Sequence, residues 1–185
     1  YNGLLGGNAD LQPETAKTWT AGVVLQPSFI PGLSLTVDYF NIEVDDAIRT
    51  FGVDAVLNNC VTNASATFTP ESCALINRDA AGSLWLTPNG FTVDLPNNVG
   101  RLQTSGIEVG GRYSVPVSFG TISFSMNGTY LDSYEVENGL TNADGSQVSY
   151  DCAGLYGPTC SVGGTSDAGA PLPRWRHKAR VSLNT

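Results

Sequence analysis

The sequence lacks the long apolar run that a membrane-spanning helix requires. No stretch of about eighteen apolar residues occurs, so no transmembrane helix is encoded. No basic segment precedes an apolar stretch near the start, so no signal peptide is present in the chain. Because the first residues look like the middle of a loop and the last like the middle of a strand, we expect the chain to be a fragment.

Basic residues are also scarce. Nine Lys and Arg stand against seventeen Asp and Glu, for a formal net charge of −8, which argues against nucleic acid as a partner. His177 is the single histidine, so no serine or cysteine has an evident catalytic base. No calcium-binding Asp motif and no phosphate-binding glycine loop occurs. We therefore expect no enzymatic activity, no catalytic or metal-binding residues, and no cofactor.

The four cysteines form two local couples. Cys60 lies near Cys73, and Cys152 lies near Cys160; neither spacing is that of a zinc knuckle. Four cysteines allow three pairings, and the sequence alone does not choose among them. Pairing within each couple costs the least closure entropy. We expect disulfides, and with them an oxidising location in the periplasm, at the cell surface or in the medium.

Strand and turn residues are abundant. The chain has 21 glycines and 10 prolines, and Ser, Thr, Asn, Val and aromatic residues fill much of the rest. Five segments alternate apolar and polar residues with a period of two, which predicts an all-β fold. A slip in this alternation between Phe40 and Ile42 predicts a bulge. The predicted strands cover residues 15–26, 33–44, 102–115, 120–131 and 173–185.

The connections between these strands alternate in length: short, long, short, long. The long ones, residues 45–101 and 132–172, contain the cysteine couples and most of the acids. Long irregular loops are rare in compact soluble domains, whereas a transmembrane β-barrel has short periplasmic turns and long extracellular loops. Each strand is close to the roughly nine to eleven residues that a tilted strand needs to cross a membrane. We predict an antiparallel up-and-down meander of about five strands, forming part of such a barrel.

The two faces of these strands differ in polarity. Alternation alone does not separate a barrel from a soluble sandwich, whose apolar face meets a second sheet. Aromatic residues near the strand ends favour the barrel, because amphipathic rings collect at membrane interfaces. His177 falls on the same apolar face, and we expect it to be interfacial. The predicted aromatic girdle consists of Trp19, Tyr39, Tyr113, Tyr130 and Trp175.

The polar faces carry charges that need water or counter-charges. Four cations occupy alternate positions on one side of the last strand. They predict either a positive lumen wall, which would attract an anionic solute or dock an acidic plug, or bases that pair with acids of adjoining strands. The predicted lumen-facing charged residues are Arg174, Arg176, Lys178, Arg180, Arg112, Glu108 and Asp38.

Segments spread in order along almost the whole chain resemble a known family. Residues 7–14, Gly-Asn-Ala-Asp-Leu-Gln-Pro-Glu, resemble the motif Asn-Pro-x-Leu-x-Pro-Glu found late in the barrel of TonB-dependent receptors, with Ala9 where proline is usual. Residues 31–42 resemble the strand that follows in that family, and residues 98–100 with 104–108 resemble the next one. Residues 173–177, Pro-Arg-Trp-Arg-His, are similar to a strand start in a subgroup with disulfide-closed surface loops.

The resemblance implies the C-terminal barrel portion of a plugged receptor with 22 strands in the outer membrane of a Gram-negative bacterium. The implied partners are outer-membrane lipid, the TonB complex acting through a plug domain that this chain lacks, and a small-molecule or oligosaccharide ligand. That solute would be a ferric siderophore, cobalamin or an oligosaccharide. No ligand-contacting residue can be carried over, because those positions vary within the family. The alternative is a secreted, disulfide-stabilised β-sandwich that serves as a binding or adhesion module; a secreted hydrolase is a weaker third interpretation.

Overall fold

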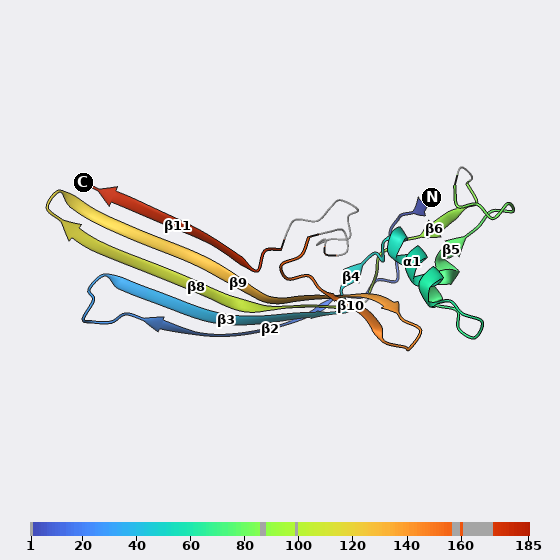
Figure 1. The fold of residues 1–185 in the computed structure, drawn as a ribbon, viewed down its shortest axis with the longest axis horizontal. Coiled ribbons are helices and arrows are strands. Elements are labelled where there is room, and N and C mark those ends of the chain that lie inside the picture. The colour runs from blue at the N-terminus through green and yellow to red at the C-terminus, as the bar shows by residue number, and fades with distance from the viewer. Residues whose placement is uncertain (1, 86–87, 99, 157–159, 161–171) are drawn as a thin grey trace.

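The computed structural model describes residues 2–85, 88–98, 100–156, 160 and 172–185. Its main element is one antiparallel sheet in the order β10-β9-β8-β3-β2, in which β11 also pairs with β9. Figure 1 shows this sheet as a long single layer, with short turns at one end and loops with a helix at the other. We refer to these as the turn end and the loop end. The strands are β2 (Thr15–Leu25), β3 (Leu33–Asp45), β8 (Arg101–Val117), β9 (Gly120–Thr141), β10 (Gln147–Asp151) and β11 (Trp175–Asn184).

The connections at the turn end are short because their residues interrupt strand pairing. Between β2 and β3, the N–H of Ile30 donates to the carbonyl of Pro27, and that of Leu33 donates to the carbonyl of Ile30. Gly32 has a φ of 82°, a conformation that side-chain-bearing residues rarely adopt. Sequence neighbours therefore become sheet neighbours, as an up-and-down meander requires.

The loop end carries a small folded unit, which we call the cap, built from residues 46–98 and the first strand of the chain. Its elements pair into two small sheets, β1-β6-β5 and β4-β7, and include one α-helix and one 3-10 helix. The first strand of the chain, β1, joins the cap by parallel pairing with β6. The elements are β1 (Gly3–Leu4), β4 (Ile48–Arg49), α1 (Val53–Asn63), η1 (Glu71–Leu75), β5 (Ile76–Asn77), β6 (Phe91–Val93) and β7 (Asn97–Asn98).

The helix α1 corrects the prediction that residues 45–101 are irregular throughout. Val56 and Asn59, one helical turn apart, are buried, and Cys60 lies on the same side, which is the spacing of an amphipathic helix. The buried carboxylate of Asp94 accepts the N–H of Gly52 at 2.9 Å and places negative charge at the helix N-terminus, where it is favourable. A helix of this length is marginal alone, and its asparagine-rich sequence resembles a loop.

The strand β9 also differs from its predicted bounds, since it continues to Thr141 instead of ending at residue 131. Ser105 pairs with Ser133 and Gly106 with Leu131, which leaves Asp132 as the extra residue of a β-bulge. Asp132 stands where the alternation would place an apolar residue, and this interruption disguises the rest of the strand. β10 then returns beside β9, and residues 142–146 form the hairpin turn. The predicted loop over residues 132–172 thus begins with strand, and its residues 157–159 and 161–171 lie outside the described part of the chain.

The predicted bulge between Phe40 and Ile42 was wrong. β3 pairs with both β2 and β8 in unbroken register from Leu33 to Asp45. The alternation slips there because the two faces of the sheet exchange polarity, as described below.

The apolar face of the described sheet is not covered by a second sheet. Val37, Phe124 and Val181 are 42%, 40% and 70% exposed, and Val109 is only half-buried. A soluble sandwich would bury these side chains between two layers. A small apolar cluster lies instead near the loop end, formed by Val136, Cys152 and Cys160 with Leu102, Tyr134 and Leu172 packed against it.

Candidate functional site: an apolar sheet face and its loop end

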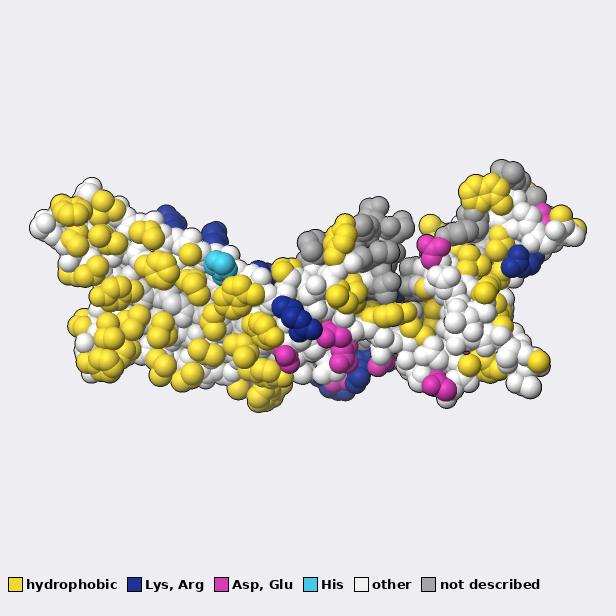
Figure 2. Space-filling model, in the orientation of Figure 1, with side chains coloured by type: hydrophobic (Ala, Val, Ile, Leu, Met, Phe, Trp, Pro, Cys, Tyr) yellow, Lys and Arg dark blue, Asp and Glu magenta, His cyan; other side chains and the backbone are white. Residues whose placement is uncertain are grey.

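The register of the sheet gathers the apolar residues of the five long strands onto one face. Paired residues of antiparallel strands point to the same side, and each apolar row continues across its neighbours. Figure 2 shows this face, where apolar side chains cover the sheet up to a group of charged ones near the loop end. The apolar face consists of Trp19, Ala21, Val23, Leu25, Leu33, Leu35, Val37, Tyr39, Ile107, Val109, Gly111, Tyr113, Val115, Ile122, Phe124, Met126, Gly128, Tyr130, Trp175, His177, Ala179, Val181 and Leu183.

One cross-strand row of this face, towards the loop end, is rich in aromatic rings. Ala21, Tyr39, Ile107, Tyr130 and Trp175 pair in succession from β2 to β11. We call this the aromatic row. Amphipathic rings in such a row suit the boundary between hydrocarbon and water.

The other two residues of the predicted girdle lie outside this row. The ring of Trp19 lies beside it, edge-on to Tyr39 with the ring centroids 5.5 Å apart. Tyr113 pairs with Leu33 and Phe124, nearer the turn end. The register places His177 on the apolar face, two residues after Trp175. Trp175 Nε1 donates a hydrogen bond to His177 Nδ1 at 3.0 Å.

Beyond the aromatic row the same face becomes charged. Lys17 Nζ lies 2.8 Å from Asp45 Oδ2, and Arg101 lies 3.2 Å from Glu43 and 3.4 Å from Glu137. On the opposite face, the residues beyond the row become apolar, and Leu102 and Val136 there contribute to the small apolar cluster. This exchange ends the apolar face abruptly. The charged collar, as we call it, consists of Lys17, Glu43, Asp45, Arg101, Glu135 and Glu137.

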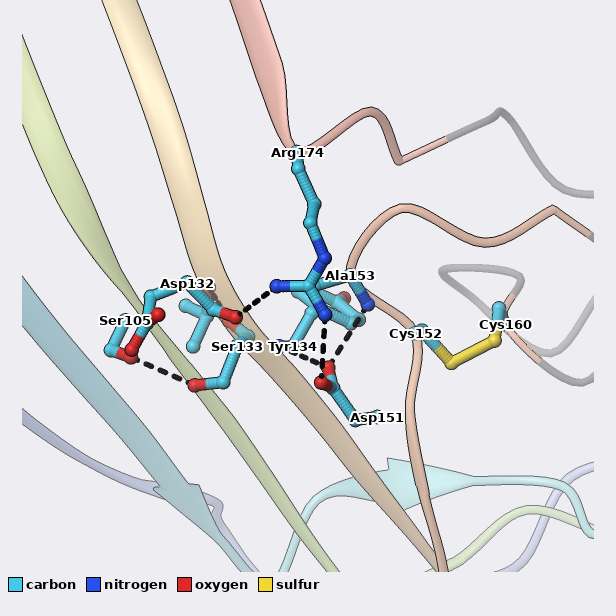
Figure 3. Close-up of polar contacts among 10 residues, drawn as sticks. Ser105, Asp132, Ser133, Tyr134, Asp151, Cys152, Ala153, Cys160 and Arg174 are labelled. Atoms are coloured by element: carbon cyan, nitrogen blue, oxygen red, sulfur yellow. Dashed lines mark hydrogen bonds and ion pairs between the residues drawn. A yellow bond between two sulfur atoms is a disulfide. The ribbon is translucent and has the colours of Figure 1, made fainter.

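Arg174 connects three segments at the loop end (Figure 3). Its guanidinium donates to the carbonyl of the bulge residue Asp132 at 2.6 Å and to Asp151 Oδ2 at 3.4 Å. Asp151 Oδ1 also accepts the N–H groups of Tyr134 and Ala153, each at 3.0 Å. Partial burial raises the pKa of the Asp151 carboxyl, but these backbone donors and Arg174 outweigh it, so the net pKa lies below its usual value.

The four cysteines pair within their local couples. This is the pairing that costs the least loop-closure entropy. Cys60 bonds Cys73 and so joins α1 to η1, whereas Cys152 bonds Cys160 just after β10.

Two asparagines of α1 attach the cap to the β9–β10 hairpin. Asn59 is 8% exposed; its Nδ2 donates to the carbonyl of Thr141 at 3.1 Å, and its Oδ1 accepts Ser72 Oγ at 2.7 Å. Asn63 Oδ1 accepts the N–H of Ala143 at 3.2 Å. The two long loops therefore contact each other through side-chain amides. Sequence reasoning missed these residues, because asparagine is a common turn residue.

Two of the segments that carry the family resemblance meet beside the start of β2. Asn98 binds the backbone of Gln12 twice: Oδ1 accepts its N–H at 2.7 Å, and Nδ2 donates to its carbonyl at 2.8 Å. Glu14 Oε1 accepts the N–H of Ile48 at 2.6 Å. These bonds fix the chain where it passes between the cap and the sheet.

The charged residues predicted for the lumen, Arg174 apart, share the polar face of the sheet. Asp38, Glu108, Thr129 and Arg176 lie in one row. Lys178 pairs with Asn127, while Arg180 and Arg112 both pair with Ser125. Among the described residues, no ion pair joins these cations to Asp38 or Glu108. Of the four cations predicted on the last strand, only Arg174 has an acidic partner among the described residues, Asp151.

The family model for the TonB dependent receptor-like β-barrel matches residues 1–184. The chain belongs to this family. Members of the TonB-dependent receptor family are outer-membrane receptors and transporters, and the antiparallel sheet agrees with part of such a barrel. No curated protein and no solved structure matches the chain.

None of the described helices is long and apolar enough to cross a membrane. The described residues also hold no group of three or more His, Cys, Asp and Glu side chains placed to bind a metal ion.

Proposed function

We propose that the chain is a lipid-facing part of an outer-membrane barrel that takes up a scarce solute in a Gram-negative bacterium. The observation that carries this proposal is the exposed apolar face that ends at the aromatic row and the charged collar. A face of this kind is stable against hydrocarbon and costly against water. The family match supplies the class of protein.

The extent of the apolar face supports a membrane-spanning sheet. With a rise of ~3.4 Å per residue, the segment of β9 from Gly120 to Tyr130 extends ~34 Å along the strand. At a tilt of about 40°, this corresponds to ~26 Å across the layer, close to the ~25 Å apolar band of outer-membrane barrels. The turn end then faces the periplasm, and the cap lies outside the cell.

The family match supports a receptor or transporter in general terms, and the remaining parts of the proposal go beyond it. The full-length protein is a plugged barrel of 22 strands, and the TonB complex drives uptake by acting on the plug. The solute is a ferric siderophore, cobalamin or an oligosaccharide, bound at the outer mouth to which the cap contributes. The chain itself catalyses no reaction and binds no cofactor.

Two matched substitutions in the full-length protein test the lipid-facing assignment. Leu35 lies on the apolar face and Thr36 on the opposite one. Leu35→Arg places a cation against hydrocarbon, at a cost of about 2–4 kcal/mol near the bilayer centre. Thr36→Arg places it in a wet interior. We expect the first variant to be strongly depleted from the outer-membrane fraction and the second to accumulate normally. Equal amounts of both variants there would contradict the proposal.

A further inference from the structure

Strand β9 contains the dipeptide Asn-Gly twice, at Asn127–Gly128 and at Asn138–Gly139. Because glycine has no side chain, it leaves its backbone nitrogen unshielded and its backbone free to rotate. When that nitrogen attacks the side-chain carbonyl carbon of the preceding asparagine, a five-membered ring closes. The two dipeptides share this chemistry but differ in structure, so the fold around each one sets how readily it reacts.

The first dipeptide is held in the sheet on both sides. Asn127 and Gly128 each pair with β8 on one side and with β11 on the other. In a strand of this kind, the asparagine side chain stands roughly perpendicular to the sheet. Attack by the Gly128 nitrogen would require its peptide group to rotate out of two ladders, which breaks hydrogen bonds to both neighbouring strands.

The second dipeptide lies in an irregular part of the hairpin. The register of β9 with β10 skips residues 138–140, which stand opposite the single residue Val148. The register of β9 with β8 ends before them, at Val136. Gly139 has a φ of 76°, which departs from strand geometry. Within the described part of the chain, residues 138–140 thus have no register partner in either strand, and their peptide groups rotate at a lower cost.

The side chain of Asn138 is folded over the peptide that follows it. Its Oδ1 accepts the N–H of Leu140 at 3.0 Å, which places the side chain beside the Gly139 peptide, as in an Asx turn. A donor on this oxygen stabilises the negative charge that develops there when the carbonyl carbon is attacked. Leu140 is buried, so this donor is fixed in place. The electrophile, its neighbouring nucleophile and the donor are therefore already together.

We propose that Asn138–Gly139 is a self-modification site at which asparagine is converted to aspartate and isoaspartate. The Gly139 nitrogen attacks Cγ of Asn138 and loses its proton, the Cγ–Nδ2 bond breaks, and the side-chain nitrogen leaves as ammonia. Water then opens the cyclic imide at either of its two carbonyl carbons. One opening gives aspartate, and the other gives isoaspartate, in which the side-chain carbons have become part of the main chain. Water is the only other reactant, and the inference does not depend on the membrane placement of the sheet.

The position of Asn138 gives the reaction a structural consequence. The product adds a carboxylate next to Glu137, which already lies 3.4 Å from Arg101, and isoaspartate also lengthens the main chain of β9. A little further along the same strand, the carbonyl of Thr141 accepts the side-chain amide of Asn59 in the cap. We expect the conversion to shift this carbonyl and to loosen the attachment of the cap to the hairpin.

Incubation of the purified full-length protein at mildly alkaline pH, followed by peptide mapping with mass spectrometry, tests the inference. Replacement of the amide by an acid raises the mass of the peptide, and fragmentation locates the site. In the folded protein we expect Asn138 to be converted at least several-fold faster than Asn127, the matched control in the same strand. In protein unfolded by guanidinium the two rates should converge, because the dipeptide is the same. Equal rates in the folded protein, or an undiminished difference in the unfolded chain, would overturn the inference.

The variant Asn138→Gln tests the consequence for the cap. Glutamine has one more methylene group, so attack by the Gly139 nitrogen would have to close a six-membered ring, which is slower. During incubation, cap amides of the wild-type protein should exchange with deuterium faster as the converted fraction grows. Those of the variant should keep their initial exchange rates. Unchanged exchange in wild-type protein whose Asn138 has been converted would refute the effect on the cap.

Discussion

Asn59 attaches the cap to the β9–β10 hairpin. It is buried, and its side chain bonds the hairpin on one side and η1 on the other. Removing this amide leaves the carbonyl of Thr141 and the hydroxyl of Ser72 without these partners, at a cost of about 1–3 kcal/mol. We expect Asn59→Ala to expose the cap and the turn at residues 142–146 to faster amide hydrogen exchange.

The neighbouring Asn58 offers a matched control for this prediction. It lies in the same helix but is exposed. Asn58→Ala should leave the exchange rates close to those of the wild-type protein. Equal protection in the two variants would mean that Asn59 does not attach the cap.

Asp151 gives the loop end a defined dependence on pH. Its pKa is lower in the folded protein than in the unfolded chain, so its stabilising contribution is complete above the unfolded value of about 3.9. The contribution is lost as pH falls below that value towards the folded pKa. We expect the amides of Tyr134 and Ala153, which donate to this carboxylate, to stay protected at neutral pH and to lose protection in acid below about pH 4.

The variant Asp151→Asn isolates this carboxylate from the other acids of the chain. It should show weaker protection of the same two amides at neutral pH and little further change in acid. If the wild-type protein and the variant lost protection in parallel, the carboxylate would not be the group responsible.

At the scale of secondary-structure elements, the bulge in β9 sets which face each later residue occupies. Before Asp132 the apolar residues of β9 lie on the membrane-facing side of our proposal, and after it Val136 lies on the opposite side. Deleting Asp132 together with Ser133 would remove the bulge, shift the later residues by one position against β8, and move Glu135 and Val136 to the wrong faces. We expect this deletion to expose the β9–β10 hairpin to proteolysis in the full-length protein.

Asp132→Ala is the control for the deletion. The contact with Arg174 uses the backbone carbonyl of Asp132, which alanine also provides. This variant should resist protease like the wild-type protein. If protease cleaved the deletion variant and Asp132→Ala at the same rate, loss of the Asp132 side chain, and not the shift in register, would explain the cleavage.

The same element shows how far the sequence could predict the structure. Alternation is a local property, and it identified the two faces of each of the five strands but not the rows that join them. It did not find the second half of β9, because Asp132 interrupts the pattern, nor α1, whose stability comes from tertiary contacts. The bonds of Asn98 to Gln12 join residues 86 positions apart, and no local pattern encodes such a contact. Spacing also grouped Arg174 with the other cations, although it precedes β11 and binds Asp151.

At the scale of the whole molecule, the aromatic row divides the sheet into two parts, which our proposal assigns to the membrane (the membrane part) and to the cell exterior (the outer part). The membrane part has an exposed apolar face and small polar residues with cations behind it. The outer part reverses this arrangement and packs its apolar residues around the Cys152–Cys160 disulfide. A single sheet can in this way be stable in two solvents, because each half turns its apolar face away from water.

Nitroxide labels placed singly along β9 of the full-length protein in lipid vesicles test this division most directly. The account predicts that labels at Ile122, Phe124 and Met126 collide with oxygen dissolved in the lipid, whereas labels at Ser123 and Ser125 do not. Beyond the bulge, a label at Glu135 should collide with a water-soluble nickel reagent instead. Uniform access of the nickel reagent along the whole strand would contradict the account.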